Sequence, residues 1–297
     1  MEPTPLNGAT VERLISAAVA APSFRGSRPW RYRLDPDTAT FQVRAVPEPG
    51  VPESEAAARV LHVSVGAAVF NLRVALAHFG WEPKVRLLPV PGDPDLLAEV
   101  RPTGPRDDGG GPYRDLYDAV WRRRGCLASA FAYCPTGAVV LELIDAAHAE
   151  GASLVLPRAE ETPRLLRLAA EAEQRCGTGG RFVGAGGRVH ENSGAAASAW
   201  LLDPERRPLV AVLCTPGDTC ADWLRAGQAI GRVVLLATAH TVQATLLHEA
   251  MEWPDLRAAL RTMDCGPGLV QMLIRFGTPA TGRRAPRVPV GEAAERG

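Results

Sequence analysis

Three stretches of the chain carry apolar residues in a pattern that predicts a helix. The first is short, with apolar side chains on one face at Val11, Leu14, Ile15, Ala18 and Val19. The other two cover residues 56–79 and 221–240 and are apolar on nearly all sides. A helix without a polar face is usually buried among other elements. The pattern therefore predicts two long central helices, one in each half of the chain.

Shorter runs predict strands between these helices. "RYRL" and "TFQVRAV" flank the turn-like "DPDTA" and read as a hairpin. Further strands are expected at "KVRLLPV", "ASLVLP", "PLVAVLCT" and "LVQMLIRF". Additional helices are expected at about 137–149, at about 160–175 and from Pro254. Because helices and strands do not alternate regularly, the order favours an α+β protein with two similar halves over a doubly wound sheet.

Two glycine-rich segments suggest how the chain is divided. Residues 101–112, "RPTGPRDDGGGP", have the composition of an internal linker. The helix after it carries Tyr113, Tyr117 and Trp121 at helical spacing, and we expect these aromatic residues in the core. Seven glycines between 177 and 194 predict either a lid over a pocket or a poorly ordered segment. The expected units are residues 1–105, a linker and helix at 106–125, and 126–297 with the lid at 176–199.

Charge and composition narrow the class of partner. Lysine plus arginine and aspartate plus glutamate both number 33, so the formal net charge is zero. This balance argues against nucleic acid or an anionic membrane as the main partner. We see no apolar run of membrane-spanning length and no basic, apolar leader, and we expect a cytoplasmic protein. The six cysteines form no C-x-x-C pair and match no zinc spacing, so no metal site is expected.

Five segments, in order along the chain, resemble the nitroreductase superfamily, and specifically its Acg-like branch. They are "AAVAAPSFRGSRPWRYRL", "SVGAAVFNLRVALAHFGW", "WLRAGQAIGRVVLLATAH", "WPDLRAALR" and "GLVQMLIRFG". The resemblance implies an antiparallel sheet flanked by helices, with two similar halves in one chain forming a pseudo-dimer. It also implies an FMN oxidoreductase that takes hydride from NAD(P)H and acts on a small organic substrate. The expected assembly is a monomer with an internal pseudo-twofold axis or a homodimer.

The resemblance also assigns cofactor-binding residues. The candidates lie in the loop after the first helix, in "RRRGCLASAF" and near the C-terminus: Ser23, Arg25, Arg28, Arg122, Arg123, Arg124, Arg275 and Arg287. Guanidinium groups suit the phosphate and the polar ring edge of FMN. Cys126, Leu127 and Ala128 stand where the branch has polar or basic residues. Losing two or three such donors weakens binding by roughly 10²- to 10⁵-fold, so weaker FMN binding is expected.

Three residues are candidates for catalysis. His248 is adjacent to Glu249, which suits acid–base chemistry. Cys126 lies beside three arginines that favour the thiolate, and His190 lies in the expected lid. Each also has a plainer interpretation, as a surface pair, a packed thiol or a loop residue. Two other functions stay open: a flavin-free enzyme of the same fold in a biosynthetic tailoring pathway, using acid–base or cysteine chemistry, and a non-catalytic flavin-sequestering protein.

Overall fold

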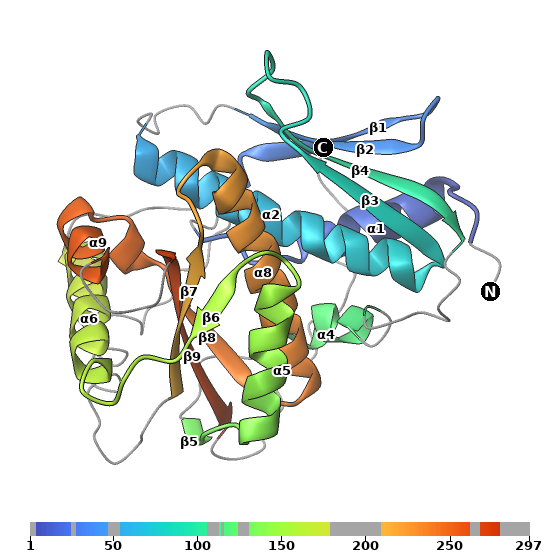
Figure 1. The fold of residues 1–297 in the computed structure, drawn as a ribbon. Coiled ribbons are helices and arrows are strands. Elements are labelled where there is room, and N and C mark those ends of the chain that lie inside the picture. Colours follow the sequence, from blue (N-terminus) through green and yellow to red (C-terminus); the bar gives the residue numbers. More distant parts are fainter. Residues whose placement is uncertain are drawn as a thin grey trace.

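The computed structural model describes residues 4–24, 28–46, 54–105, 113, 116–123, 131–178, 209–261 and 268–279. The first part contains α1 (Gly8–Val19), β1 (Trp30–Asp35), β2 (Thr40–Ala45), α2 (Glu55–His78), β3 (Trp81–Leu87), β4 (Leu96–Pro105) and α4 (Leu116–Arg122). The second part contains β5 (Phe131–Tyr133), α5 (Gly137–His148), β6 (Ser153–Val155), α6 (Thr162–Thr178), β7 (Leu209–Thr215), α8 (Cys220–Ala239), β8 (Gln243–Leu247), η2 (Glu249–Met251), α9 (Pro254–Arg261) and β9 (Leu269–Pro279). Figure 1 shows the long helices α2 and α8 crossing between the two groups of strands.

The strands form two antiparallel sheets. The first has the order β1-β2-β4-β3, and the second runs β5-β9-β7-β6, with β8 also pairing with β9. The predicted hairpin is present, with Trp30 opposite Ala45 and Asp35 opposite Thr40. Every pairing in both sheets is antiparallel. The α+β class with antiparallel sheets and flanking helices is therefore confirmed.

The two long helices pack against each other at the centre, as their apolar pattern predicts. Ser54 caps the start of α2, and its side chain accepts a hydrogen bond from the backbone of Ala57. Thr219 and Asp222 form a reciprocal capping box at the start of α8. Gly80, after α2, has a φ of 88°, the left-handed conformation that glycine adopts at helix ends. Local sequence thus fixes where both helices begin and where α2 ends.

The buried apolar residues form three clusters around these helices. One lies between α1, α2 and the first sheet and includes Phe41 and Phe70. A second lies between α5, α8 and the second sheet and includes Ile230 and Phe276. The third lies beneath α6, η2 and α9. Because α8 contributes Leu224 to the first cluster, and α2 contributes to the second, the two halves share their interior.

Two sequence interpretations are wrong in detail. The expected linker begins too early, because residues 101–105 belong to β4, where Val100 pairs with both Phe41 and Val85. The proline and glycine residues at the end of this strand have the composition of a linker, so the strand was predicted too short. Its residues nevertheless alternate between buried and exposed from Val100 to Thr103. Trp121 is also not in the core, because 39% of it is exposed.

Helix α2 has the length that the sequence predicts, but it contains an apolar stretch of membrane-spanning length that the sequence interpretation did not expect. Among the described residues it is the one helix with the length and composition to cross a membrane, with a mean hydropathy of 1.7. Of its apolar window, 83% is buried inside the fold, as for the central helix of a folded domain. The rest of the expected linker, and the expected lid beyond residue 178, lie outside the described residues.

Candidate functional site

The segment between α1 and β1 lies where several predicted site residues meet. Arg123, directly after α4, donates a hydrogen bond from Nη2 to the backbone carbonyl of Ala20. Four residues later, the ring of Phe24 lies with its centroid 5.2 Å from that of His248. The segment from Ala20 to Phe24, which includes Ser23, is therefore held between the end of α4 and the loop after β8. Three stretches that are far apart in sequence meet here.

His248 lies between two carboxylates. Its Nδ1 is 3.5 Å from Oε1 of Glu249, and its Nε2 is 3.5 Å from Oε1 of Glu252. The sequence interpretation placed adjacent residues on different faces and so discounted the pair with Glu249. The tight turn of η2 instead lets the imidazole reach both carboxylates. A ring held in this way can exchange a proton with either neighbour.

Arg275 lies in the interior, in the middle of β9. It pairs along the backbone with Val210 of β7 and Thr245 of β8, and only 5% of it is exposed. Glu173 of α6 is close enough to interact with it electrostatically. Burial raises the pKa of Glu173 to about 7, Glu249 also raises it, and Arg275 opposes the shift. Arg275 is thus part of a group of interacting charges with Glu173 and with Glu249, the residue after His248.

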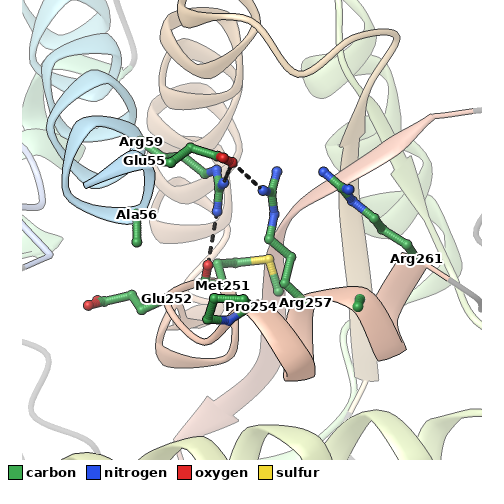
Figure 2. A pocket seen from close by; sticks show the side chains of 9 residues that line it. Glu55, Ala56, Arg59, Met251, Glu252, Pro254, Arg257 and Arg261 are labelled. Carbon is green, nitrogen blue, oxygen red and sulfur yellow. Dashed lines mark hydrogen bonds and ion pairs between the residues drawn. The ribbon is translucent and has the colours of Figure 1, made fainter.

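A separate pocket opens at the start of α2 and has a volume of about 230 Å³. It is lined by Glu55, Ala56, Arg59, Met251, Glu252, Pro254, Arg257, Ala258 and Arg261, and Figure 2 shows the three arginines reaching it from α2 and α9. We call it the Arg59 pocket. Glu252 connects the pocket to His248, because this residue lines the pocket and its carboxylate contacts the imidazole.

Hydrogen bonds cross the Arg59 pocket. Oε1 of Glu55 accepts from Nη2 of Arg59 at 2.7 Å and from Nη1 of Arg257 at 2.9 Å. Arg59 also donates from Nη1 to the carbonyl oxygen of Met251 at 2.9 Å. Arg257 and Arg261 both donate to Asp218. The arginines therefore tie the start of α2 to the turn and helix that follow His248.

Burial and charge shift two ionisation equilibria in this network. Burial lowers the pKa of Arg59 to about 10, and the nearby positive charge of Arg257 acts in the same direction. Burial would raise the pKa of Asp218, but hydrogen bonds from Trp223 and Gln271 and the charge of Arg257 lower it to about 2. Asp218 is therefore a fixed negative charge behind the arginines.

The sequence interpretation missed this pocket. Glu55 and Arg59 show helical i,i+4 spacing, which is a common surface pattern, and no local signal connects them to Arg257, 202 residues from Glu55. Two histidines of α2, His62 and His78, make structural contacts. Nδ1 of His62 lies 2.6 Å from the carbonyl oxygen of Ala58, and His78 stacks on Tyr117.

Only some of the remaining predicted site residues lie among the residues that the structure describes. Arg28 lies just before β1, and Arg122 is exposed at the end of α4. Five lie outside the described residues, namely Arg25, Arg124, Cys126, His190 and Arg287. A single pocket lined by all the predicted arginines stays a prediction. Within the described residues, no group of three or more His, Cys, Asp or Glu side chains could hold a metal ion.

The amino-acid sequence of this chain is similar to those of two Mycobacterium tuberculosis proteins. It is 28% identical to a Mycobacterium tuberculosis protein named "Putative NAD(P)H nitroreductase Rv3131", over 96% of this chain and 90% of the relative. It is 25% identical to "Uncharacterized protein Rv3127" from the same organism, over 90% of this chain and 86% of the relative. No protein-family profile matches the sequence.

Solved structures with some likeness were also found. A nitroreductase with bound FMN from Desulfitobacterium hafniense has a TM-score of 0.40 and 12% identity, covering 61% of this chain and 97% of its own. The FMN-dependent nitroreductase NfnB from Mycobacterium smegmatis, in complex with NADPH, has a TM-score of 0.36 and 18% identity, covering 61% and 99%. The chain is thus similar over nearly its whole length to a mycobacterial protein that is named as a nitroreductase.

Proposed function

We propose that this protein is an oxidoreductase of the nitroreductase superfamily, of the Acg-like branch, that uses FMN and NAD(P)H on a small organic substrate. The similarity to the M. tuberculosis protein named as an NAD(P)H nitroreductase supports the class, because it extends over 96% of the chain. The structural observation that carries the proposal is the position of residues 20–24 between Arg123 and His248. The resemblance assigns flavin contacts to residues 20–24 and to the end of α4, and His248 is a candidate for proton transfer because of its carboxylate neighbours.

The side chains near this segment suit a flavin phosphate. Ser23 carries a hydroxyl group, and Arg28, Arg122 and Arg123 carry guanidinium groups, of which that of Arg123 contacts Ala20. Charge-assisted hydrogen bonds from guanidinium groups hold phosphate groups strongly. These four residues, with Arg25 and Arg124, are the proposed holders of FMN, which when bound supplies hydride transfer. Arg287 is proposed as a further phosphate contact. Arg275 is buried beside Glu173, so we propose for it an electrostatic role beneath the site.

His248 is the proposed proton-transfer residue. An imidazole is the side chain best suited to move a proton near neutral pH. Glu249 and Glu252 hold the ring from both nitrogens, which fixes its orientation. Phe24 covers the ring on another side and reduces its contact with water. A substrate bound over this segment would take its proton from an oriented, partly shielded group.

Visible absorbance of the purified protein tests the proposal most directly. We expect a flavin spectrum after addition of FMN and oxidation of NAD(P)H in the presence of a quinone or a nitroaromatic compound. The double substitution Cys126→Thr with Ala128→Arg restores a hydroxyl and a guanidinium, and we expect it to tighten FMN binding by at least about tenfold. Tight flavin binding without a gain in the double variant would contradict the inferred loss of donors.

A flavin-free enzyme of the same fold is the second candidate. Cys126, Leu127 and Ala128 favour it, because they replace donors that the flavin phosphate needs. This candidate predicts no flavin spectrum in either form of the protein. Substitution of His248, Cys126 and His190 in turn would then identify the group that carries acid–base or cysteine chemistry. A protein that binds FMN tightly and oxidises no NAD(P)H would instead be flavin-sequestering.

The arrangement of the chain is proposed on the same basis. We propose that the halves 1–105 and 126–297 are related by a pseudo-twofold axis, with α2 and α8 on either side of it. Both helices are buried, and their apolar side chains pack in the same clusters. The proposed location is the cytoplasm. Light scattering after size exclusion distinguishes a monomer from a homodimer of such pseudo-dimeric chains.

A further inference from the structure

The Arg59 pocket holds two cationic side chains that are almost completely buried. The side chain of Arg59 is 4% exposed and that of Arg257 is 8% exposed. Within the described residues, Nε of each is buried and has no hydrogen-bond partner. A buried guanidinium with an unsatisfied donor destabilises the fold, because the hydrogen bond that this donor made to water is not replaced. Both guanidinium groups therefore stay incompletely hydrogen-bonded, with their Nη atoms directed to Glu55.

The group that faces these arginines is the least buried part of the network. The side chain of Glu55 is 66% exposed, yet one of its oxygens accepts hydrogen bonds from both Arg59 and Arg257. An exposed carboxylate is held weakly in such a pair, because water and salt compete for it. Glu55 can turn into solvent, whereas the two arginines are fixed by burial. Its carboxylate therefore occupies the place of an exchangeable ligand.

Charge and helix orientation favour an anion at the same place. With Glu55 turned outward, three guanidinium groups line the pocket, and Asp218 is the carboxylate that accepts hydrogen bonds from Arg257 and Arg261. The Glu252 carboxylate points away from the arginines (Figure 2). Ala56, in the first turn of the 24-residue helix α2, also lines the pocket. The positive end of a helix dipole adds to the attraction of an anion. Figure 2 shows the side chain of Arg261 extending from α9 beside that of Arg257.

We propose that the Arg59 pocket binds the carboxylate group of a small organic molecule in place of the Glu55 side chain. A planar carboxylate matches the two guanidinium groups that Glu55 now bridges. Its second oxygen is available to Arg261, whose guanidinium donates to Asp218 and is 46% exposed. The site requires no flavin, so its test is independent of the proposed oxidoreductase activity.

Titration calorimetry with benzoate at constant ionic strength tests the site. We expect Glu55→Gln to raise benzoate affinity roughly three- to tenfold, because it removes the competing charge. We expect Arg261→Gln to lower it by roughly threefold, because one donor at the open side is lost. Both changes are at exposed side chains, and each substitution keeps a polar side chain at its position. Arg225→Gln is the matched control, because Arg225 is also 46% exposed and pairs with an aspartate.

Each alternative outcome overturns the proposal. Unchanged benzoate affinity in Glu55→Gln would mean that Glu55 does not compete for the pocket and that the arginines are only a structural tie. Equal losses of benzoate affinity in Arg261→Gln and Arg225→Gln would show that benzoate is attracted to positive surface charge in general and not to this pocket. Binding of inorganic phosphate but not of benzoate would assign the pocket to phosphate groups, and an equal heat from chloride would show that no carboxylate site exists.

Discussion

Gly66 of α2 lies directly against Gly227 of α8. A Cβ atom built on Gly66 would lie 2.9 Å from the Cα atom of Gly227, and one on Gly227 would lie 2.8 Å from the Cα atom of Gly66. Real Cβ atoms essentially never approach other atoms so closely. The two central helices therefore pack at a distance that only glycine permits at this crossing.

Replacement of either glycine should force the helices apart. We expect Gly227→Ala to lower the free energy of unfolding by about 1–3 kcal/mol or more, because the added methyl group meets backbone that cannot move aside. Urea denaturation followed by circular dichroism measures the change. Gly137→Ala, at the start of α5, is the control, because nothing lies within 4 Å of its added Cβ. Equal destabilisation in the two variants would contradict the close crossing.

Glu150 connects the same two helices through charge. Its buried carboxylate, 4% exposed, pairs with Arg73 of α2 and with Arg232 of α8. We expect Glu150→Ala to cost about 3–5 kcal/mol of stability, because it leaves two half-buried guanidinium groups without their counter-ion. Denaturant unfolding is again the measurement.

Glu142→Ala provides the comparison for Glu150. Glu142 also belongs to an ion pair, with His240, but its side chain is 52% exposed. Its removal should change stability by less than about 1 kcal/mol. If Glu150→Ala had an equally small effect, the buried pair would contribute nothing to holding α2 and α8 together.

The predictable part of the fold is the part encoded by local pattern. The stretches without a polar face identified α2 and α8, and alternation identified the β1–β2 hairpin. The end of β4 was missed because Pro102 and Gly104 resemble a linker. At this end of the strand, pairing with β3 determines the structure more than local propensity does.

The site was less predictable because its parts meet only in three dimensions. His248 was identified from its neighbour Glu249, but its second partner, Glu252, depends on the turn of η2. The Arg59 pocket depends on the contact between the start of α2 and α9. Net charge and residue spacing carry no information on such a contact, since each residue alone resembles an ordinary surface charge.

Thr241 adopts a conformation that is unfavourable for its side chain. Directly after the last residue of the α8 cap, it has a φ of 58°. Left-handed backbone costs a β-branched residue more than it costs glycine. We expect Thr241→Gly to raise the free energy of unfolding by about 0.5–1 kcal/mol, because relief of strain exceeds the added entropy of the unfolded chain.

Thr238→Gly, one turn earlier in α8, should have the opposite effect. Thr238 lies inside the helix, where glycine costs roughly 0.5–1 kcal/mol through backbone entropy. Thermal unfolding of both variants gives the two signs side by side. A loss of stability in both would show that Thr241 is not strained in solution.

Glu173 should make stability depend on pH near neutrality. Burial raises its pKa from 4.5 to about 7, with Glu249 adding to the shift and Arg275 opposing it. The folded protein therefore binds this proton more tightly than the unfolded chain does. Its favourable contribution is complete below about pH 4.5 and is lost as the pH rises through about 7.

Glu173→Gln should remove this dependence, because glutamine stays neutral at every pH. We expect the variant and the natural protein to be similarly stable at about pH 4, and the variant to be more stable by about 1–3 kcal/mol at about pH 8. Glu171→Gln, on the same helix, is the control, because Glu171 is 49% exposed and paired with Arg175. Urea unfolding across this pH range measures the difference. A Glu173→Gln curve parallel to that of the natural protein would show that the carboxyl ionises in the folded state as it does in the unfolded chain.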